Sequence, residues 1–82
     1  MAHRFSDELH GQMARATSVG AKFVLINSWE LYDDAGGLPG VDRNLPLCRI
    51  AMRKDMLPGD VLLVESGSGL SIRYLLPRKP NN

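Results

Sequence analysis

Cys48, His3 and His10 are the residues whose side chains best suit nucleophilic chemistry. A histidine beside a cysteine can act as its base and make the thiolate available near neutral pH. The spacing of these residues gives no reason for them to meet, and a lone cysteine between Leu47 and Ile50 is typical of a small core residue. We therefore expect a protein that is not an enzyme and has no catalytic residues.

Metal and cofactor binding are also disfavoured by the spacing of the candidate ligands. The histidines and carboxylates show none of the short spacings of zinc sites, and the run GGLPG lacks the closing Gly-Lys-Ser/Thr of a phosphate loop. Asp33, Asp34 and Asp42 could offer oxygen ligands to calcium, but they lack the EF-hand order and suit solvated turns. We expect neither a metal nor a cofactor.

Basic side chains are concentrated in the second half of the chain. Up to Asp42 there are three basic and six acidic residues, whereas from Arg43 onward seven basic residues face three acidic ones. On a strand, Arg49 and Arg53 would project from one face and could contact phosphates with salt-sensitive affinity. The interspersed acids and the lack of interleaved aromatic residues favour a solvated face instead. The candidate nucleic-acid contacts are Arg43, Arg49, Arg53 and Lys54.

Aromatic and arginine residues around a long loop form the preferred candidate for a protein-binding surface. Residues 33–46 carry the glycines, prolines and acids of an irregular connection, which is long for so small a domain. Aromatic and arginine side chains supply most of the binding energy at interfaces, although Trp29 could instead belong to the core. The candidate contacts are Trp29, Tyr32, Leu38 and Arg43. We expect a small regulator or inhibitor, of the kind that bacteria and phages encode, that binds a larger protein; a DNA-binding regulator is the alternative.

The length and the single cysteine limit the class of protein. Eighty-two residues make one domain with a small core, and one cysteine cannot form an internal disulfide, which favours a cytoplasmic setting. No apolar run approaches the roughly 20 residues that cross a bilayer, and the N-terminus lacks the apolar run of a secretion signal. We expect residues 1–76 to form one compact domain and residues 77–82 a flexible tail.

The N-terminal segment predicts a helix. Ser6 suits an N-cap because acids follow it, and Gly20 suits the C-terminal end. Apolar residues recur every three or four positions and would line one helical face: Phe5, Leu9, Met13 and Ala16.

The remaining segments predict strands and turns. Residues 22–32 are rich in β-branched and aromatic residues and suit a strand. Residues 47–54 fit either a strand, which we prefer, or a short helix. A Pro-Gly turn at 57–60 leads into the strand 61–65, and a glycine loop leads to its hairpin partner. One face of that partner holds Leu70, Ile72, Tyr74 and Leu76, and the other holds Ser71 and Arg73. The expected fold is α+β, with one N-terminal helix packed on a small, mostly antiparallel sheet of about four strands.

Two of the expected strands lack a polar face. Residues 23–26 and 61–64 are apolar at every position, yet one helix can cover only one face of a sheet. Leaving large apolar side chains in water would cost about 1.5–3 kcal/mol each. The second face must therefore meet a second copy of the chain or close into a barrel, and a homodimer would also supplement the small core.

The run LPLCRIAMRKDMLPGDVLLVESGSGLSIRYL resembles the swapped-hairpin AbrB-type transcription factors. In that family a strand and a short segment lead to a Pro-Gly-Asp turn, an apolar strand, a glycine turn and a final strand. Leu57–Asp60 and Gly67–Ile72 carry the likeness, whereas Lys54 and Asp55 stand where the family usually has leucine and glycine. The resemblance implies a DNA-binding dimer with Arg43, Arg49 and Arg53 near the phosphates.

Overall fold

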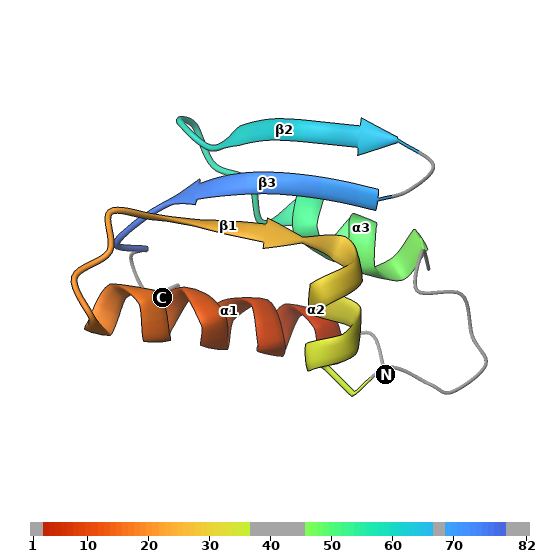
Figure 1. The fold of residues 1–82 in the computed structure, drawn as a ribbon, viewed down its shortest axis with the longest axis horizontal. Helices are drawn as coiled ribbons and strands as arrows, with labels where there is room; N and C mark the ends of the chain where they lie inside the picture. The colour runs from red at the N-terminus through yellow and green to blue at the C-terminus, as the bar shows by residue number, and fades with distance from the viewer. Residues whose placement is uncertain (1–2, 37–45, 67–68, 79–82) are drawn as a thin grey trace.

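Three helices pack on one side of a three-stranded sheet in the computed structural model, which describes residues 3–36, 46–66 and 69–78 (Figure 1). The predicted α+β class with an N-terminal helix is confirmed, with three strands in place of four. Along the chain the elements are α1 (His3–Ser18), β1 (Phe23–Asn27), α2 (Ser28–Asp34), α3 (Pro46–Lys54), β2 (Val61–Ser66) and β3 (Gly69–Leu75).

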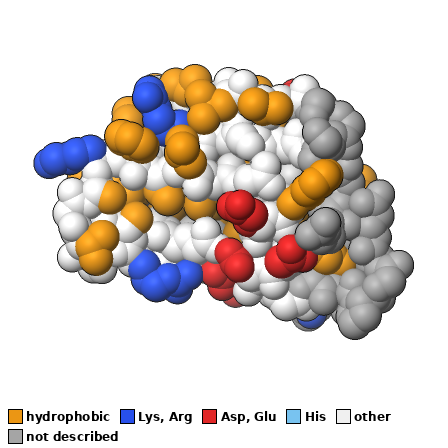
Figure 2. Space-filling view, in the orientation of Figure 1, with side chains coloured by type: hydrophobic (Ala, Val, Ile, Leu, Met, Phe, Trp, Pro, Cys, Tyr) orange, Lys and Arg blue, Asp and Glu red, His pale blue; other side chains and the backbone are white. Residues whose placement is uncertain are grey.

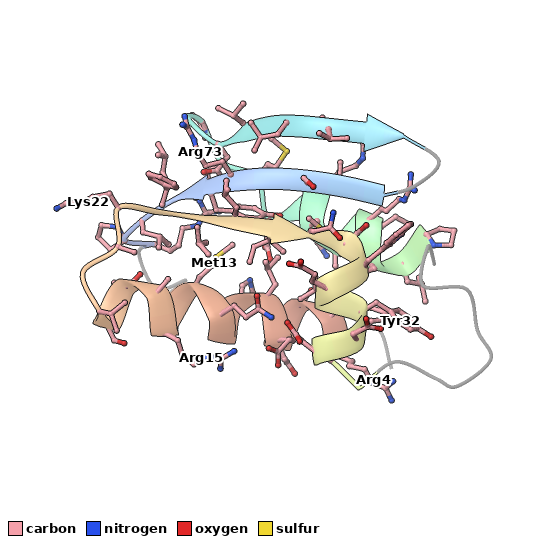
Figure 3. The ribbon with its side chains drawn as sticks, viewed as in Figure 1. Arg4, Met13, Arg15, Lys22, Tyr32 and Arg73 are labelled. Atoms are coloured by element: carbon pink, nitrogen blue, oxygen red, sulfur yellow. The ribbon has the colours of Figure 1, made fainter. Side chains whose placement is uncertain are left out.

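Helix α1 has the apolar face that its sequence predicts. Phe5, Leu9 and Met13 are all buried, at a spacing of four residues. Met13 points from α1 toward the sheet, whereas Arg15 points away from it (Figure 3). The 3.6-residue period of the sequence therefore determined how this helix docks.

Both ends of α1 are defined by local features. The helix begins at His3, one turn before the predicted N-cap Ser6, and this extra turn brings Phe5 against Tyr32 with 5.7 Å between ring centroids. The N-cap prediction was wrong because burial of that aromatic pair favours a longer helix than the local capping pattern does. Gly20 follows the helix with a φ of 85°, as a C-terminal glycine should.

The predicted strand over residues 22–32 is correct only in its first half. Strand β1 ends at Asn27, whose Oδ1 accepts hydrogen bonds from the backbone N–H groups of Trp29 and Glu30, at 2.9 and 3.4 Å, and so caps α2. Asparagine followed three residues later by glutamate is a helix-start signal that the aromatic composition had outweighed. Leu31 and Tyr32 are consequently both buried, which a strand would not allow for neighbours on a half-covered sheet.

The strand preferred for residues 47–54 is wrong, because this segment forms α3. Pro46 occupies the first helical position, where its missing N–H would have no partner in any case. Cys48, Ala51 and Met52 are buried at helical spacing, and two basic residues in the last turn complement the helix dipole. This helix takes the place of one of the four predicted strands, which leaves three.

The sheet is antiparallel throughout, in the order β1-β3-β2, and its β2–β3 pair forms the predicted hairpin. Ile72 of β3 pairs with Ile26 on one side and Leu62 on the other. The register shifts between Leu62 and Val64, as at a β-bulge. Within the described residues the sheet is open and does not close into a barrel.

The core lies between the sheet and the helices. As predicted, alternate residues of β3 face inward and are buried, and Tyr74 among them donates its hydroxyl to the Met52 carbonyl at 2.7 Å. That carbonyl lies in the last turn of α3, where the helix itself provides no donor. The inward residues of this strand and its end are Leu70, Ile72, Tyr74 and Leu76.

Asp60 ties the turn before β2 to the end of β3. Its side chain is fully buried and accepts hydrogen bonds from the backbone N–H groups of Leu57 and Leu75, each at 2.8 Å. It also pairs with Arg78, whose Nη1 lies 2.7 Å from Oδ2 and whose guanidinium lies over the Tyr74 ring. Arg78, which the sequence places in a flexible tail, is thus held against the sheet; the tail beyond it lies outside the described residues.

Candidate interaction surfaces

The predicted protein-binding residues do not gather on one described surface. Tyr32 is 2% exposed and stacks on Phe5, so it belongs to the core. Trp29 is half-buried in the first turn of α2, three residues before Tyr32. The other two candidates, Leu38 and Arg43, lie outside the described residues.

The predicted nucleic-acid contacts lie on α3 and not on a strand. Arg53 and Lys54 are exposed, Arg49 is half-buried, and Arg43 lies outside the described part of the chain. Arg49 and Arg53 still share a face, because residues four apart are neighbours on a helix. Arg53 pairs with Glu65 of β2, so the last turn of α3 is joined to the hairpin.

Five acidic side chains of the described residues lie on α1 and α2. Figure 2 shows acidic groups gathered over the helical part of the face that it views, and the sixth acid of the first half, Asp42, lies outside the described residues. Hydrophobic side chains gather instead over the strands in that view. The acidic residues of α1 and α2 are Asp7, Glu8, Glu30, Asp33 and Asp34.

The side of the sheet that faces away from the helices is largely apolar and uncovered. Residues on this side alternate with core residues along each strand, as strand geometry requires. Its apolar members are between 38% and 58% exposed, so the second apolar face expected from the sequence is present and open in the single chain. This outer sheet face comprises Phe23 and Leu25 of β1, Arg73 and Leu75 of β3, and Val61 and Val64 of β2.

Cys48 is placed as a core residue. Its side chain is fully buried, and its thiol donates to the backbone carbonyl of Ser28 at 3.3 Å. Burial raises the pKa of the Cys48 thiol to about 11. His10, one of its two possible bases, pairs instead with Asp55 at 2.7 Å on the surface. The arrangement provides no thiolate near neutral pH.

Cys48 is expected to resist thiol reagents while the protein is folded. A rise in pKa from 9.0 to about 11 lowers the thiolate fraction at pH 8 by roughly 100-fold, and burial blocks access as well. Labelling with a disulfide reagent should therefore be at least about 100-fold slower in buffer than in 8 M urea. Equal rates in the two solutions would contradict the buried position.

The described residues contain no ready-made metal site or membrane span. Across 3–36, 46–66 and 69–78, no three His, Cys, Asp or Glu side chains are grouped so as to hold a metal ion. No helix within those ranges is long and apolar enough to cross a bilayer.

No protein-family model matches the chain, and no curated protein or solved structure is significantly similar to it.

Proposed function

We propose that this chain is a small DNA-binding regulatory domain that presents α3, with the adjoining β2–β3 hairpin, to the duplex. The observation that carries the proposal is its topology. The element order α1-β1-α2-α3-β2-β3 and the sheet order β1-β3-β2 are those of a winged helix-turn-helix domain. In a helix-turn-helix the second helix of the pair enters the major groove, and here that helix is α3.

Topology alone does not assign a function, so the side chains of α3 must support it. Lys54 is exposed in the last turn, next to Arg53, and Arg49 lies one turn earlier on the same face as Arg53. Such cations can neutralise phosphates. Two exposed apolar residues, Leu47 and Ile50, lie on the same helix and could contact thymine methyl groups.

Two features restrict how the domain would approach DNA. The acidic side chains of α2 would repel phosphates, so contact is expected from α3 and the hairpin and not from α2. The connection between the helices covers residues 35–45, whereas a simple helix-turn-helix uses three or four residues. The AbrB-like resemblance would need a strand where α3 lies, so the proposed contact is made by a helix.

Binding to a random-sequence 30-base-pair duplex is the direct test. By fluorescence anisotropy, we expect a Kd in the range of about 1–100 µM near physiological salt, weakening steeply as salt is raised. The double variant Arg53→Gln/Lys54→Gln should lose about tenfold or more in affinity, and its salt dependence should fall by about two ion equivalents. Arg15→Gln, which removes a charge from α1, is the matched control and should have little effect.

A variant with the opposite expected effect sharpens this test. Glu65→Gln removes the carboxylate that pairs with Arg53 and so frees that guanidinium for a phosphate. Its affinity for the duplex should rise a few-fold. Absence of binding at 100 µM duplex, or binding that neither Arg53→Gln/Lys54→Gln nor Glu65→Gln changes, would refute the proposal.

The outer sheet face favours a second function, binding of another protein. It is the opposite side of the sheet from α3, so both functions are compatible. A regulator that binds a protein partner was the expectation from the sequence, but the surface that now supports it is the sheet and not the surroundings of Trp29. The apolar side chains and the one cation of the outer sheet face indicate which kind of protein segment would bind there.

A further inference from the structure

The outer sheet face combines apolar residues with one cation at its centre. Arg73 lies on the middle strand, paired in register with Leu25 of β1 and Val61 of β2. Phe23 and Leu75, paired with each other, extend the face toward one end. Side chains of this size, each about half exposed, leave a patch of roughly several hundred Å², the size at which exposed patches are often functional.

Arg73 has no carboxylate partner among the described residues. Its guanidinium lies 5.6 Å from the centroid of the Phe23 ring, and its Nε is buried without a hydrogen-bond partner in the described structure. Arg78, by contrast, is paired with Asp60, and Arg53 with Glu65. A cation held on an aromatic ring and surrounded by apolar side chains is suited to pair with an acidic group from outside.

The position of Arg73 also bears on whether a second copy covers this face. A symmetric dimer brings equivalent surfaces together, so two faces meeting at their centres would place Arg73 opposite its own copy. Like charges facing each other in an interface are strongly unfavourable. None of the residues that make up the outer sheet face is acidic, so the second copy would offer no compensating carboxylate there.

We propose that the outer sheet face binds a segment of another protein that presents apolar side chains around one carboxylate, which pairs with Arg73. Phe23, Leu25, Val61, Val64 and Leu75 bury the apolar part of that segment. Arg73 selects for the acidic residue. This site does not depend on DNA binding, because α3 lies on the other side of the sheet.

The test uses a displayed library of random 12-residue peptides, selected in parallel on the full-length protein and on its Arg73→Glu variant. Peptides enriched on the unaltered protein should carry Asp or Glu flanked by apolar residues, and those enriched on Arg73→Glu should carry Lys or Arg instead. A synthetic peptide from the first pool should bind at least tenfold more weakly to Arg73→Glu and to Leu25→Gln. Arg15→Glu, a charge reversal on α1, should bind it as tightly as the unaltered protein does.

Folding and self-association are monitored in the same experiment. Arg73 and Leu25 project from the outer face, so circular dichroism should show folded variants, and Leu25→Gln should keep the DNA affinity of the unaltered protein. Enrichment without acidic residues, or binding indifferent to Arg73, would overturn the proposal. Light scattering that shows a dimer, and the loss of that dimer in Leu25→Gln, would also overturn the proposal, because the outer sheet face would then bind a second copy of the chain.

Discussion

Replacing Asp60 by alanine is expected to lower the free energy of unfolding by roughly 3 kcal/mol. The carboxylate is fully buried and serves three partners, the backbone N–H groups of Leu57 and Leu75 and the guanidinium of Arg78. Without it, two N–H groups lose their acceptor and a largely buried cation loses its carboxylate partner. Urea unfolding followed by the fluorescence of Trp29, the single tryptophan, measures the loss.

Asp7→Ala provides the matched control. Asp7 is an exposed aspartate on α1, and its removal should change stability by less than about 1 kcal/mol. If Asp60→Ala were no more destabilising than this control, the buried cluster would not contribute to stability as its geometry indicates.

The contribution of Asp60 should also depend on pH. Burial of the Asp60 carboxyl by itself would raise its pKa, but the hydrogen bonds from Leu75 and Leu57 and the charge of Arg78 outweigh burial and hold the pKa below its ordinary value of 3.8. A pKa that is lower in the folded state gives stability that is present above about pH 3.8 and is lost as the pH falls through the folded pKa. The difference in stability between the unaltered protein and Asp60→Asn should therefore shrink in that acidic range. A constant difference from pH 7 to pH 2 would contradict the lowered pKa.

Leu9→Ala is the second change with a large expected effect, a loss of about 3 kcal/mol in the free energy of unfolding. Leu9 is fully buried on the face of α1 that packs into the core, and truncation leaves a cavity that the surrounding side chains fill only in part. In a small domain this loss is a large share of the total stability. Urea unfolding at pH 7 gives the value.

Leu25→Ala is the same substitution on the outer sheet face. Leu25 is 58% exposed, so its truncation should cost less than about 1 kcal/mol. The difference between the two leucines tests whether the outer face of β1 is open in solution while the inner face of α1 is buried. Equal losses of stability at both positions would show that the side chain of Leu25 is buried in solution.

Local patterns were sufficient for several parts of the fold. The apolar residues Phe5, Leu9, Met13 and Ala16 recur at steps of four, four and three, and only a helix places all of them on one face. The alternation through Ile72 and Tyr74 is typical of a strand. The Pro-Gly turn and the hairpin followed from turn chemistry in the same way. These elements were predictable because neighbours in sequence are sufficient to define them.

The candidate sites were predicted less well than the fold. Arg53 and Lys54 were identified from their charge, and they remain candidates on a helix in place of a strand. Tyr32 was predicted to bind a partner because aromatic side chains supply much of the energy of interfaces. Helix α2 instead buries both Leu31 and Tyr32, and the stacking of Tyr32 on Phe5 shows that Tyr32 is a core residue.

The sequence by itself determined the class, the N-terminal helix, the hairpin and the presence of two apolar sheet faces, because composition and short-range periodicity encode them. Only the tertiary structure decided that residues 46–54 form a helix and that Arg78 pairs with Asp60. It also decided that Arg73 lies on an open sheet face with no carboxylate partner in the part of the chain that the structure describes. The physical reason is that a short segment matching two periodicities takes the one that long-range contacts favour. Here the apolar side of α3 packs into the core, and the hydroxyl of Tyr74 donates to the backbone carbonyl of Met52. Charge pairing between distant residues likewise depends on which side chains the packed core brings together.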